Sequence, residues 1–258
     1  MFPPTIRSLA KSCAVLLLGR ETRPRKIVRG LASGYRICVS PTDHLGYLLG
    51  TTEPHLQRII RQYVAVGDTV YDIGANIGYV SLALAKSVGP SGQVIAFEPI
   101  PKNVQYFRES IEINGLTNVQ LLEFAASDQR GEAVIRIAGN LSTASLVWHR
   151  HDPSATQLTI NTVQIDQLVE SGSLAYPRFV KIDVEGAEGS VLKGMQRTVA
   201  AAKPILFIEC SEAGREATWT MLRDLGYQCQ SAITRKPIDS FEAYRHSDFL
   251  WLPSSVDI

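Results

Sequence analysis

The sequence predicts an α/β fold, a doubly wound and mainly parallel sheet of seven strands with a small N-terminal extension. The first observation is one βαβ unit, in which β-rich residues 69–73 end at a glycine, apolar residues recur at helical spacing from Gly78, and residues 94–97 form a second strand-like run. The second is a pair of apolar runs that end in acidic residues and flank a helical stretch. The seven strand-like runs are 69–73, 94–97, 119–124, 178–183, 204–210, 227–231 and 249–252. Helical stretches between such runs indicate a doubly wound sheet.

The length and composition of the chain suit one large domain. A chain of 258 residues with 45% hydrophobic residues can bury a sizeable core. We expect residues 1–66 to form the extension and residues 67–258 to form the main domain. The 26 basic and 25 acidic residues nearly cancel, so no general field favours nucleic acid or an anionic membrane.

The cysteines and the N-terminal residues bear on cellular location. Four cysteines lie far apart without Cys-x-x-Cys spacing, which indicates neither a zinc site nor a disulfide framework, so we expect buried thiols and a cytoplasmic protein. The apolar run 13–19 is at the lower length limit for a signal peptide and no Ala-x-Ala-like site follows it. We expect a short amphipathic helix and a basic linker there, with a weak peripheral membrane contact as an open alternative.

The rest of the extension contains a hairpin and a helix. Residues 27–39 are expected to form the hairpin, with Gly34 available for its turn. Residues 40–52 are rich in turn formers, and Glu53-Pro54 opens a helix that runs to about Tyr63, because proline suits the first helical turn. We expect this segment to lie over the ligand crevice of the main domain.

The turn of the βαβ unit carries glycines and a carboxylate. It reads Asp72-x-Gly74-x-Asn76-x-Gly78, and Glu98 closes the second strand twenty residues after Gly78. Glycines without a Cβ let the backbone approach a ligand closely, and an acidic residue at that strand end can accept both hydroxyls of a ribose. The unit therefore predicts a nucleoside-bearing cofactor.

The spacing in this turn argues against a dinucleotide. The dinucleotide fingerprint is Gly-x-Gly-x-x-Gly, and the anion of Asp72 would repel a pyrophosphate. The same carboxylate could pair with an ammonium group, directly or through water. The turn therefore suits a cofactor whose tail is an amino acid, and S-adenosylmethionine is the common one.

The segment after this unit should complete the cofactor site. A helix begins near Pro101 and ends at Asn114-Gly115, and residues 125–128 follow the third strand. They are expected to lie beside the adenine, because the third strand neighbours the second and the crevice runs along their carboxyl ends. We expect Ala126 there, and Asp128 as an acceptor for the adenine amino group, with a turn-forming aspartate as the alternative.

A polar segment further along is a candidate for recognising the substrate. Residues 132–137 alternate as a short strand, residues 158–163 form another, and residues 139–156 between them are polar and irregular. Long irregular loops in compact domains are often functional, so we expect Ser142 and His149 to contact a polyol or sugar. The alternative is a solvated connector with incidental histidines.

Carboxylates gather after the fourth and fifth strands, where the transferred methyl group should point. Displacement at a sulfonium requires a positioned nucleophile and, for a hydroxyl, a base. We expect Asp183 to be the base or a substrate-orienting acceptor, with Glu185 and Glu209 holding neighbouring hydroxyls. A structural role for Glu185 as a helix cap, a histidine base, and a divalent cation such as Mg²⁺ bound by the same oxygens remain alternatives. The sequence does not require the metal.

Four motifs resemble one protein family. Tyr71-Asp-Ile-Gly-Ala-Asn-Ile-Gly-Tyr79, Ala96-Phe-Glu-Pro99, Asn114-Gly115 and Lys181-Ile-Asp-Val-Glu-Gly-Ala-Glu188 follow one another in an order that resembles the FkbM-type methyltransferases. The resemblance implies the class I methyltransferase sheet, a Rossmann-like order with an antiparallel last strand, and S-adenosylmethionine as cofactor. It also implies that Glu53 is a site residue, with a helix-start carboxylate as the alternative.

The family resemblance implies O-methylation of a sugar, glycolipid or polyketide-like metabolite. The alternatives are a small-molecule N-methyltransferase, an NAD-dependent oxidoreductase and a catalytically silent cofactor-binding module. A nucleic-acid substrate is not expected, because the chain has no basic excess and no Asn-Pro-Pro-Tyr-like motif after the fourth strand. The acceptor and the oligomeric state stay open at this point.

Overall fold

The computed structural model describes residues 21–137, 156–212, 214–240, 242 and 246–254. Its strands are β1 Arg23–Lys26, β2 Arg36–Val39, β3 Thr69–Ile73, β4 Gln93–Phe97, β5 Val119–Leu122, β6 Ala125–Ala126, β7 Gly131–Ile137, β8 Thr156–Val163, β9 Phe179–Asp183, β10 Ile205–Glu209, β11 Tyr227–Ser231, β12 Pro237–Ile238 and β13 Asp248–Pro253. Its helices are α2 Pro41–Leu49, α3 Pro54–Tyr63, α4 Tyr79–Val88, α5 Pro101–Ile113, α6 Ile165–Glu170, α7 Glu188–Gly194, α8 Gln196–Ala202 and α9 Arg215–Asp224.

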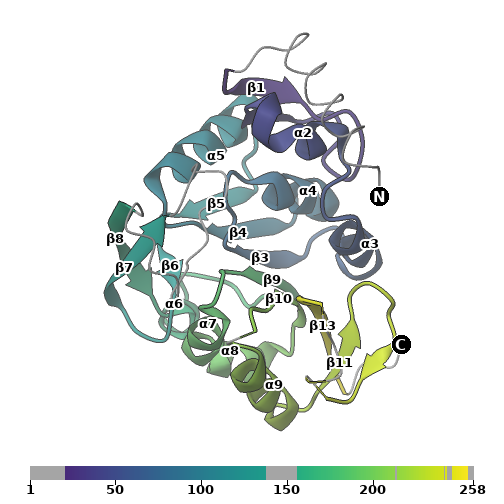
Figure 1. Ribbon diagram of the computed structural model, residues 1–258, viewed down its shortest axis with the longest axis vertical. Coiled ribbons are helices and arrows are strands. Elements are labelled where there is room, and N and C mark those ends of the chain that lie inside the picture. Colours follow the sequence, from purple (N-terminus) through teal and green to yellow (C-terminus); the bar gives the residue numbers. More distant parts are fainter. Residues whose placement is uncertain (1–20, 138–155, 213, 241, 243–245, 255–258) are drawn as a thin grey trace.

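The main sheet has the order β12-β11-β13-β10-β9-β3-β4-β5. In Figure 1 it can be followed upwards from β11 to β5. Strands β5, β4, β3, β9 and β10 are parallel to one another, and β13 is antiparallel to both β10 and β11. This is the doubly wound, mainly parallel, Rossmann-like order of class I methyltransferases, and the predicted antiparallel last strand is confirmed. The two-residue strand β12 adds an eighth member at one edge.

Alternation along the strands gives the sheet two apolar faces, because successive side chains of a strand point to opposite sides. Val70, Val94 and Phe179 belong to the core cluster that contains the buried residues of α3 and α4. Tyr71 and Val180, one position along, belong to the cluster that contains the buried residues of α6, α7, α8 and α9. Helices therefore cover both faces of the sheet. Because both faces are buried, the sequences of the central strands are almost continuously apolar.

The N-terminal extension departs from expectation in two elements. Strands β1 and β2 pair as a hairpin, but β1 at 23–26 precedes the expected range 27–39 and lies in the expected basic linker. Gly34 has φ +93° in the connection, and α3 begins at Pro54 as expected. The segment 40–52, expected to be rich in turns, instead contains α2, which is kinked at His44. The turn-forming residues of this segment do not predict a helix. The helix is favoured by burial of Leu48 and by packing of Tyr47 against the apolar cluster that contains Tyr79 and Leu82.

The third strand is shorter than expected, and the residues after it belong to a second sheet. Strand β5 ends at Leu122, and Ala125–Ala126 form β6, which pairs with β8 and lies in a separate three-stranded sheet, β6-β8-β7. This sheet lies beside the β5 edge, at the left of Figure 1. The helical stretch expected after the fourth strand is likewise two helices, α7 and α8, separated at Met195.

No helix within the described residues is both long and apolar enough to cross a lipid bilayer. Cys38, Cys210 and Cys229 are buried free thiols, as the wide spacing of the cysteines predicts. Burial raises the pKa of both Cys38 and Cys210 to about 12, so these thiols are poor nucleophiles at neutral pH.

Candidate active site

The turn between β3 and α4 is tied to the end of β4. The backbone N–H groups of Gly74 and Ala75 both donate to the Phe97 carbonyl at 3.0 Å, and the N–H of Asn76 donates to the Glu98 carboxylate at 2.8 Å. Gly74, Asn76 and Gly78 all have positive φ values, of 77°, 51° and 90°. The predicted strand-to-helix turn is thus a left-handed backbone path fixed by hydrogen bonds.

The two glycines of this turn are required by neighbouring protein atoms. A Cβ on Gly74 would lie 1.9 Å from the Asp183 carbonyl oxygen, and a Cβ on Gly78 would lie 2.2 Å from the Phe107 ring. The sequence motif suggests ligand approach as the reason for glycine. The structure supplies a different one, which is close packing of the turn against β9 and α5.

Glu98 is buried, with 4% of its surface exposed, and it is held by the turn. Its carboxylate accepts from the N–H groups of Asn76 and Ile100 and from the Asn103 amide, at 2.8, 3.0 and 3.2 Å. Burial raises the pKa of Glu98, and these donors oppose that shift. A carboxylate offers about four acceptor positions, so about one is left for a ligand hydroxyl.

Asp72 is fully buried and has a cationic partner within the protein. Its Oδ1 lies 3.1 Å from the Lys181 ammonium, and the Ser81 hydroxyl donates to its Oδ2 at 2.6 Å. Asp72 and Lys181 are register partners on the adjacent parallel strands β3 and β9, which puts both side chains on one face of the sheet. Any pairing of Asp72 with a cofactor ammonium is therefore shared with Lys181.

Lys181 also lines this part of the structure, although the sequence marks it only as the start of a motif and not as a site residue. Its ammonium also donates to the Gly74 carbonyl at 2.7 Å and lies 3.4 Å from Asp183 Oδ2. The signal for it is a lysine inside an otherwise apolar strand, Phe-Val-Lys-Ile, at a position that alternation turns inward. A lysine there requires an anionic partner, because isolated charges are very costly to bury.

A cavity of about 60 Å³ opens at the carboxyl ends of β3, β9 and β10, on the α3 and α4 side. Three predicted acidic residues from distant parts of the chain, Glu53, Asp183 and Glu209, meet here beside the predicted cofactor residues Gly74 and Asn76. Tyr47 and Tyr79 also line it and stack with ring centroids 4.4 Å apart. The full lining is Tyr47, Glu53, Leu56, Gly74, Ala75, Asn76, Tyr79, Val80, Lys181, Asp183, Phe207 and Glu209.

Negative charge accumulates around this cavity. Burial, followed by the nearby carboxylates of Asp183, Asp248, Glu53 and Glu185, raises the pKa of Glu209 to about 8. Burial also raises the pKa values of Glu53 and Glu185, and Asp183 contributes to both shifts. Glu209 therefore holds a proton at neutral pH, and its Oε1 accepts weakly from the Ser247 hydroxyl at 3.4 Å.

Backbone strain collects at the same place. Glu53, Asn76 and Glu185 adopt left-handed φ values of 50°, 51° and 48°, and they are three of the five non-glycine residues with positive φ in the described part of the chain. Such residues cost on the order of 1–3 kcal/mol each and cluster at functional sites. Glu53 directly precedes α3, and its side chain makes no capping hydrogen bond there, so the carboxylate is left to the cavity.

The remaining predicted residues lie elsewhere. Ala126 is buried in β6, and Asp128 follows it with an exposed side chain. Neither lines the cavity at Asp183. Ser142 and His149 lie outside the described residues. Glu188 is fully buried and accepts from Gly186 N–H and the Ser211 hydroxyl, so it fixes the start of α7.

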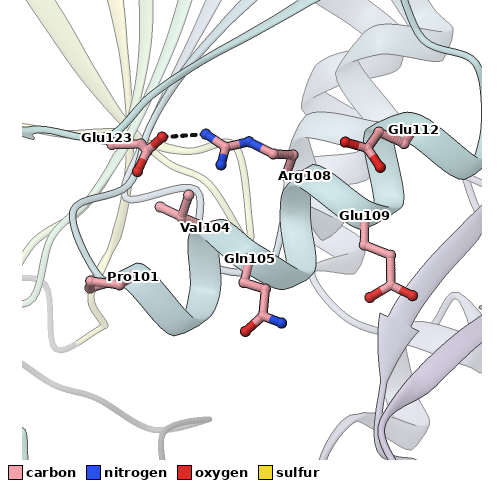
Figure 2. Close-up of a pocket in the computed structure, with 7 residues that line it drawn as sticks. All are labelled: Pro101, Val104, Gln105, Arg108, Glu109, Glu112 and Glu123. Atoms are coloured by element: carbon pink, nitrogen blue, oxygen red, sulfur yellow. Dashed lines mark hydrogen bonds and ion pairs between the residues drawn. The ribbon is translucent and has the colours of Figure 1, made fainter.

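Metal binding finds no support in the described residues, since no group of three His, Cys, Asp or Glu side chains there is arranged to hold an ion. A second cavity, of about 340 Å³, lies along α5 (Figure 2). Its acidic side chains, Glu109 and Glu112, extend from the C-terminal half of α5, and Arg108 pairs with Glu123 across it. None of the predicted site residues belongs to this cavity.

Comparison with known proteins gives the family. The Methyltransferase FkbM domain model matches residues 72–229, more than half of the chain. The hexuronic acid methyltransferase AglP of Haloferax volcanii is 28% identical over 155 residues, which cover 60% of this chain and 61% of AglP. A protein-L-isoaspartate O-methyltransferase of Aeropyrum pernix is 45% identical over 91 residues, which cover 35% of this chain and 31% of that enzyme. The chain thus matches less than two thirds of the length of these relatives.

The crystal structure of an FkbM methyltransferase from Methylobacillus flagellatus is similar with a TM-score of 0.48 and 20% identity, covering 82% of this chain and 53% of that one. A SAM-dependent O-methyltransferase from Thermotoga maritima gives a TM-score of 0.44 and 15% identity, covering 78% and 65%. The fold assignment rests on the strand order itself. With the domain match over residues 72–229, the chain belongs to the FkbM family of S-adenosylmethionine-dependent methyltransferases.

Proposed function

We propose that this enzyme methylates a hydroxyl group of a neutral, sugar-like acceptor, and that Asp183 is the general base. The proposal rests on one observation, that Asp183, Glu53 and Glu209 line the same cavity as Tyr47 and Tyr79. This cavity lies beside the turn from Gly74 to Gly78, which we call the cofactor turn. Attack on a sulfonium methyl leaves a neutral thioether, so the protein must orient the nucleophile and accept its proton. A carboxylate at the cavity wall can do both.

The cofactor side of the proposal uses the chain's own acceptors. S-adenosylmethionine supplies an electrophilic methyl group. The acceptor capacity left on Glu98 suits a ribose hydroxyl, and the turn from Gly74 to Gly78 would hold the methionine part. Ala126 and Asp128 are proposed beside the adenine. Asp72 contributes by holding Lys181 under this turn.

The charge of the cavity bears on the acceptor. Its described lining contains three carboxyl groups, Glu53, Asp183 and Glu209, and one ammonium, which the protein already engages. An acceptor carboxylate would meet like charge there without a compensating cation, whereas hydroxyl donors would be favoured. The name of the relative AglP supports a sugar acceptor, and the acidic lining favours a neutral one, such as a glycoside, a glycolipid sugar or a polyketide alcohol.

N-methylation of a small amine is the second candidate, because the same acidic lining would attract an amine. NAD-dependent oxidation is dropped, since the family match identifies a methyltransferase. The near balance of 26 basic and 25 acidic residues gives no reason to propose nucleic acid.

The test is methyl transfer from S-adenosylmethionine to a panel of neutral glycosides, the matching hexuronates and small amines, read by mass spectrometry with and without a chelator. We expect products from neutral hydroxyl acceptors in both conditions. Loss of activity with chelator that Mg²⁺ restores would move the mechanism to a metal-bound diol, and exclusive amine products would replace O-methylation.

The base is tested with Asp183→Asn. We expect kcat to fall by roughly 10²- to 10⁴-fold, the usual contribution of a general base, while S-adenosylmethionine affinity stays within a few-fold. Asp224→Asn is the matched control, because Asp224 is exposed at the end of α9. Full activity of Asp183→Asn would remove Asp183 as the base.

A further inference from the structure

The ammonium of Lys181 sits at the junction of three chain segments. Its Nζ contacts Asp72 Oδ1 at the end of β3 at 3.1 Å, the Gly74 carbonyl in the cofactor turn at 2.7 Å, and Asp183 Oδ2 at the end of β9 at 3.4 Å. These segments also touch directly, because the Gly74 Cα faces the Asp183 carbonyl oxygen at a distance that no Cβ would allow.

The three contacts of Lys181 are one hydrogen bond and two ion pairs. Its ammonium donates to the Gly74 carbonyl and lies within ion-pair distance of Asp72 and Asp183. The side chain is almost fully buried, with 4% exposed, and its pKa is raised by Asp72 and Asp183 despite burial, so it remains charged. Because its charge is balanced by two carboxylates and its ammonium is bonded to the Gly74 carbonyl, Lys181 is suited to holding these protein groups in place.

The three groups that contact Lys181 differ in how many other contacts fix them. Asp72 is fixed a second time by Ser81, and Gly74 is fixed a second time by the Phe97 carbonyl. Within the described part of the chain, the Asp183 carboxylate is held by the ammonium of Lys181 alone. The position of the Asp183 carboxylate therefore depends on Lys181 more than the positions of Asp72 and Gly74 do.

We propose that Lys181 is a positioning residue that aligns the Asp183 carboxylate with the cofactor turn at Gly74. The inference rests on the proposed role of Asp183 as base. It gives the lysine of the Lys-Ile-Asp run a task in the reaction beyond neutralising Asp72. A group acting through another is sensitive to small displacements, since a misplacement of about 1 Å can cost about 10²-fold in rate.

The test removes the ion pair as a unit. Lys181→Met alone would leave the buried Asp72 carboxylate uncompensated and the protein prone to unfold. The double variant Asp72→Asn/Lys181→Met keeps an acceptor for the Ser81 hydroxyl and leaves no lone buried charge. Lys193→Met, at an exposed position on α7, is the control for loss of a lysine.

We expect the double variant to unfold cooperatively and to bind S-adenosylmethionine within about 10-fold of the wild type. Its kcat should fall by about 10²-fold, because the base is no longer aligned. Its KM for S-adenosylmethionine should stay within a few-fold, because the turn keeps its hydrogen bonds to the Phe97 carbonyl. The nearby acidic residues Glu53, Glu185, Glu209 and Asp248 are unchanged in the variant.

A role confined to folding gives a different result, namely a lower melting temperature with wild-type kcat in the folded variant, and that result would overturn the proposal. An acceptor-free readout separates this outcome from failure of the proposed function. The ¹³C-carboxyl signal of Asp183, assigned with Asp183→Asn, should change its chemical shift in the double variant and keep it in Lys193→Met, because only the double variant lacks the contact with Lys181. If it does so while the wild type methylates no hydroxyl, the positioning contact stands and the proposed acceptor class fails.

Discussion

Two buried carboxyl groups of the site, Glu98 and Glu209, differ in how the protein satisfies them. Glu98 accepts three hydrogen bonds from the turn and from α5, which stabilise its ionised form. Glu209 has one weak donor, Ser247, and faces other carboxylates, which stabilise its protonated form. Hydrogen-bond donors thus favour the charged form of Glu98, whereas burial and neighbouring carboxylates favour the neutral form of Glu209.

Glu98→Ala should weaken S-adenosylmethionine binding by roughly 1.5–3 kcal/mol, the range for a hydrogen bond to a charged group. The variant also frees the N–H groups of Asn76 and Ile100, so its melting temperature must be recorded beside the titration calorimetry. Glu123→Ala, an exposed acid after β5, serves as the control. Unchanged affinity in folded Glu98→Ala would show that the ribose binds elsewhere.

Glu209 makes stability depend on pH. The folded protein holds this proton up to about pH 8, whereas an unfolded chain releases it near the ordinary value of 4.5. Between these values the unfolded state binds fewer protons, so the stability contributed by the group falls as pH rises through this window. Relative to Glu209→Gln, the wild type should lose about 1–2 kcal/mol between pH 5 and 9, after allowing for solvent screening of a partly exposed group.

The measurement is urea unfolding of both proteins at several pH values, with Glu216→Gln as an exposed control on α9. Stability curves for wild type and Glu209→Gln that run parallel over the whole window would refute the raised pKa of Glu209.

At the scale of elements, the site is made by the carboxyl ends of β3, β9 and β10 and the turns that follow them. Parallel register sets Asp72 beside Lys181 and Asp183 beside Glu209. The turn after β3 must then pass close to the end of β9, which only a residue without a Cβ permits. Sheet register and one glycine therefore decide how near the cofactor turn lies to the proposed base.

Gly74→Ala should be far more damaging than a glycine replacement at a similar backbone angle elsewhere. Gly172 has φ +74°, close to the +77° of Gly74, but nothing lies within 4 Å of the Cβ it would gain. Gly172→Ala should cost about 1–2 kcal/mol for its left-handed backbone alone. Gly74→Ala should cost about 2 kcal/mol more, because the new Cβ overlaps the Asp183 carbonyl. Denaturant unfolding of the two variants checks the difference, and equal losses would contradict it.

At the scale of the whole molecule, the site is closed by a layer from the N-terminal extension. Tyr47 of α2, together with Glu53 and Leu56 at the start of α3, lines the cavity over the sheet. Tyr47 stacks on Tyr79 of the main domain, and Gln57 donates to the Tyr79 hydroxyl at 3.3 Å. We propose that residues 1–66 and 67–258 act as cover and core of one catalytic unit.

The sequence by itself determined the order and type of the principal elements. Apolar runs of strand length, helical spacing, and the Pro and Gly that bound α3 and α5 are local signals, and they fix β3, β4, α5, β9 and β10 closely. The combined motifs also identify the methyltransferase family. The acidic residues that end β9 and β10 were predictable site candidates, because the carboxyl ends of parallel strands meet at one edge of a sheet.

Only the tertiary structure decided how the side chains are paired. Helix α2 is stabilised by distant packing that its turn-forming residues hide, and β6 leaves the main sheet to pair with β8. Three contacts join residues about 110 positions apart in sequence. They are the ion pair of Asp72 with Lys181, the close packing of Gly74 against Asp183, and the hydrogen bond from Lys181 to Gly74. Alternation along a strand predicts which face of the sheet a side chain occupies. The register between strands that are distant in sequence determines which charged group lies next to it.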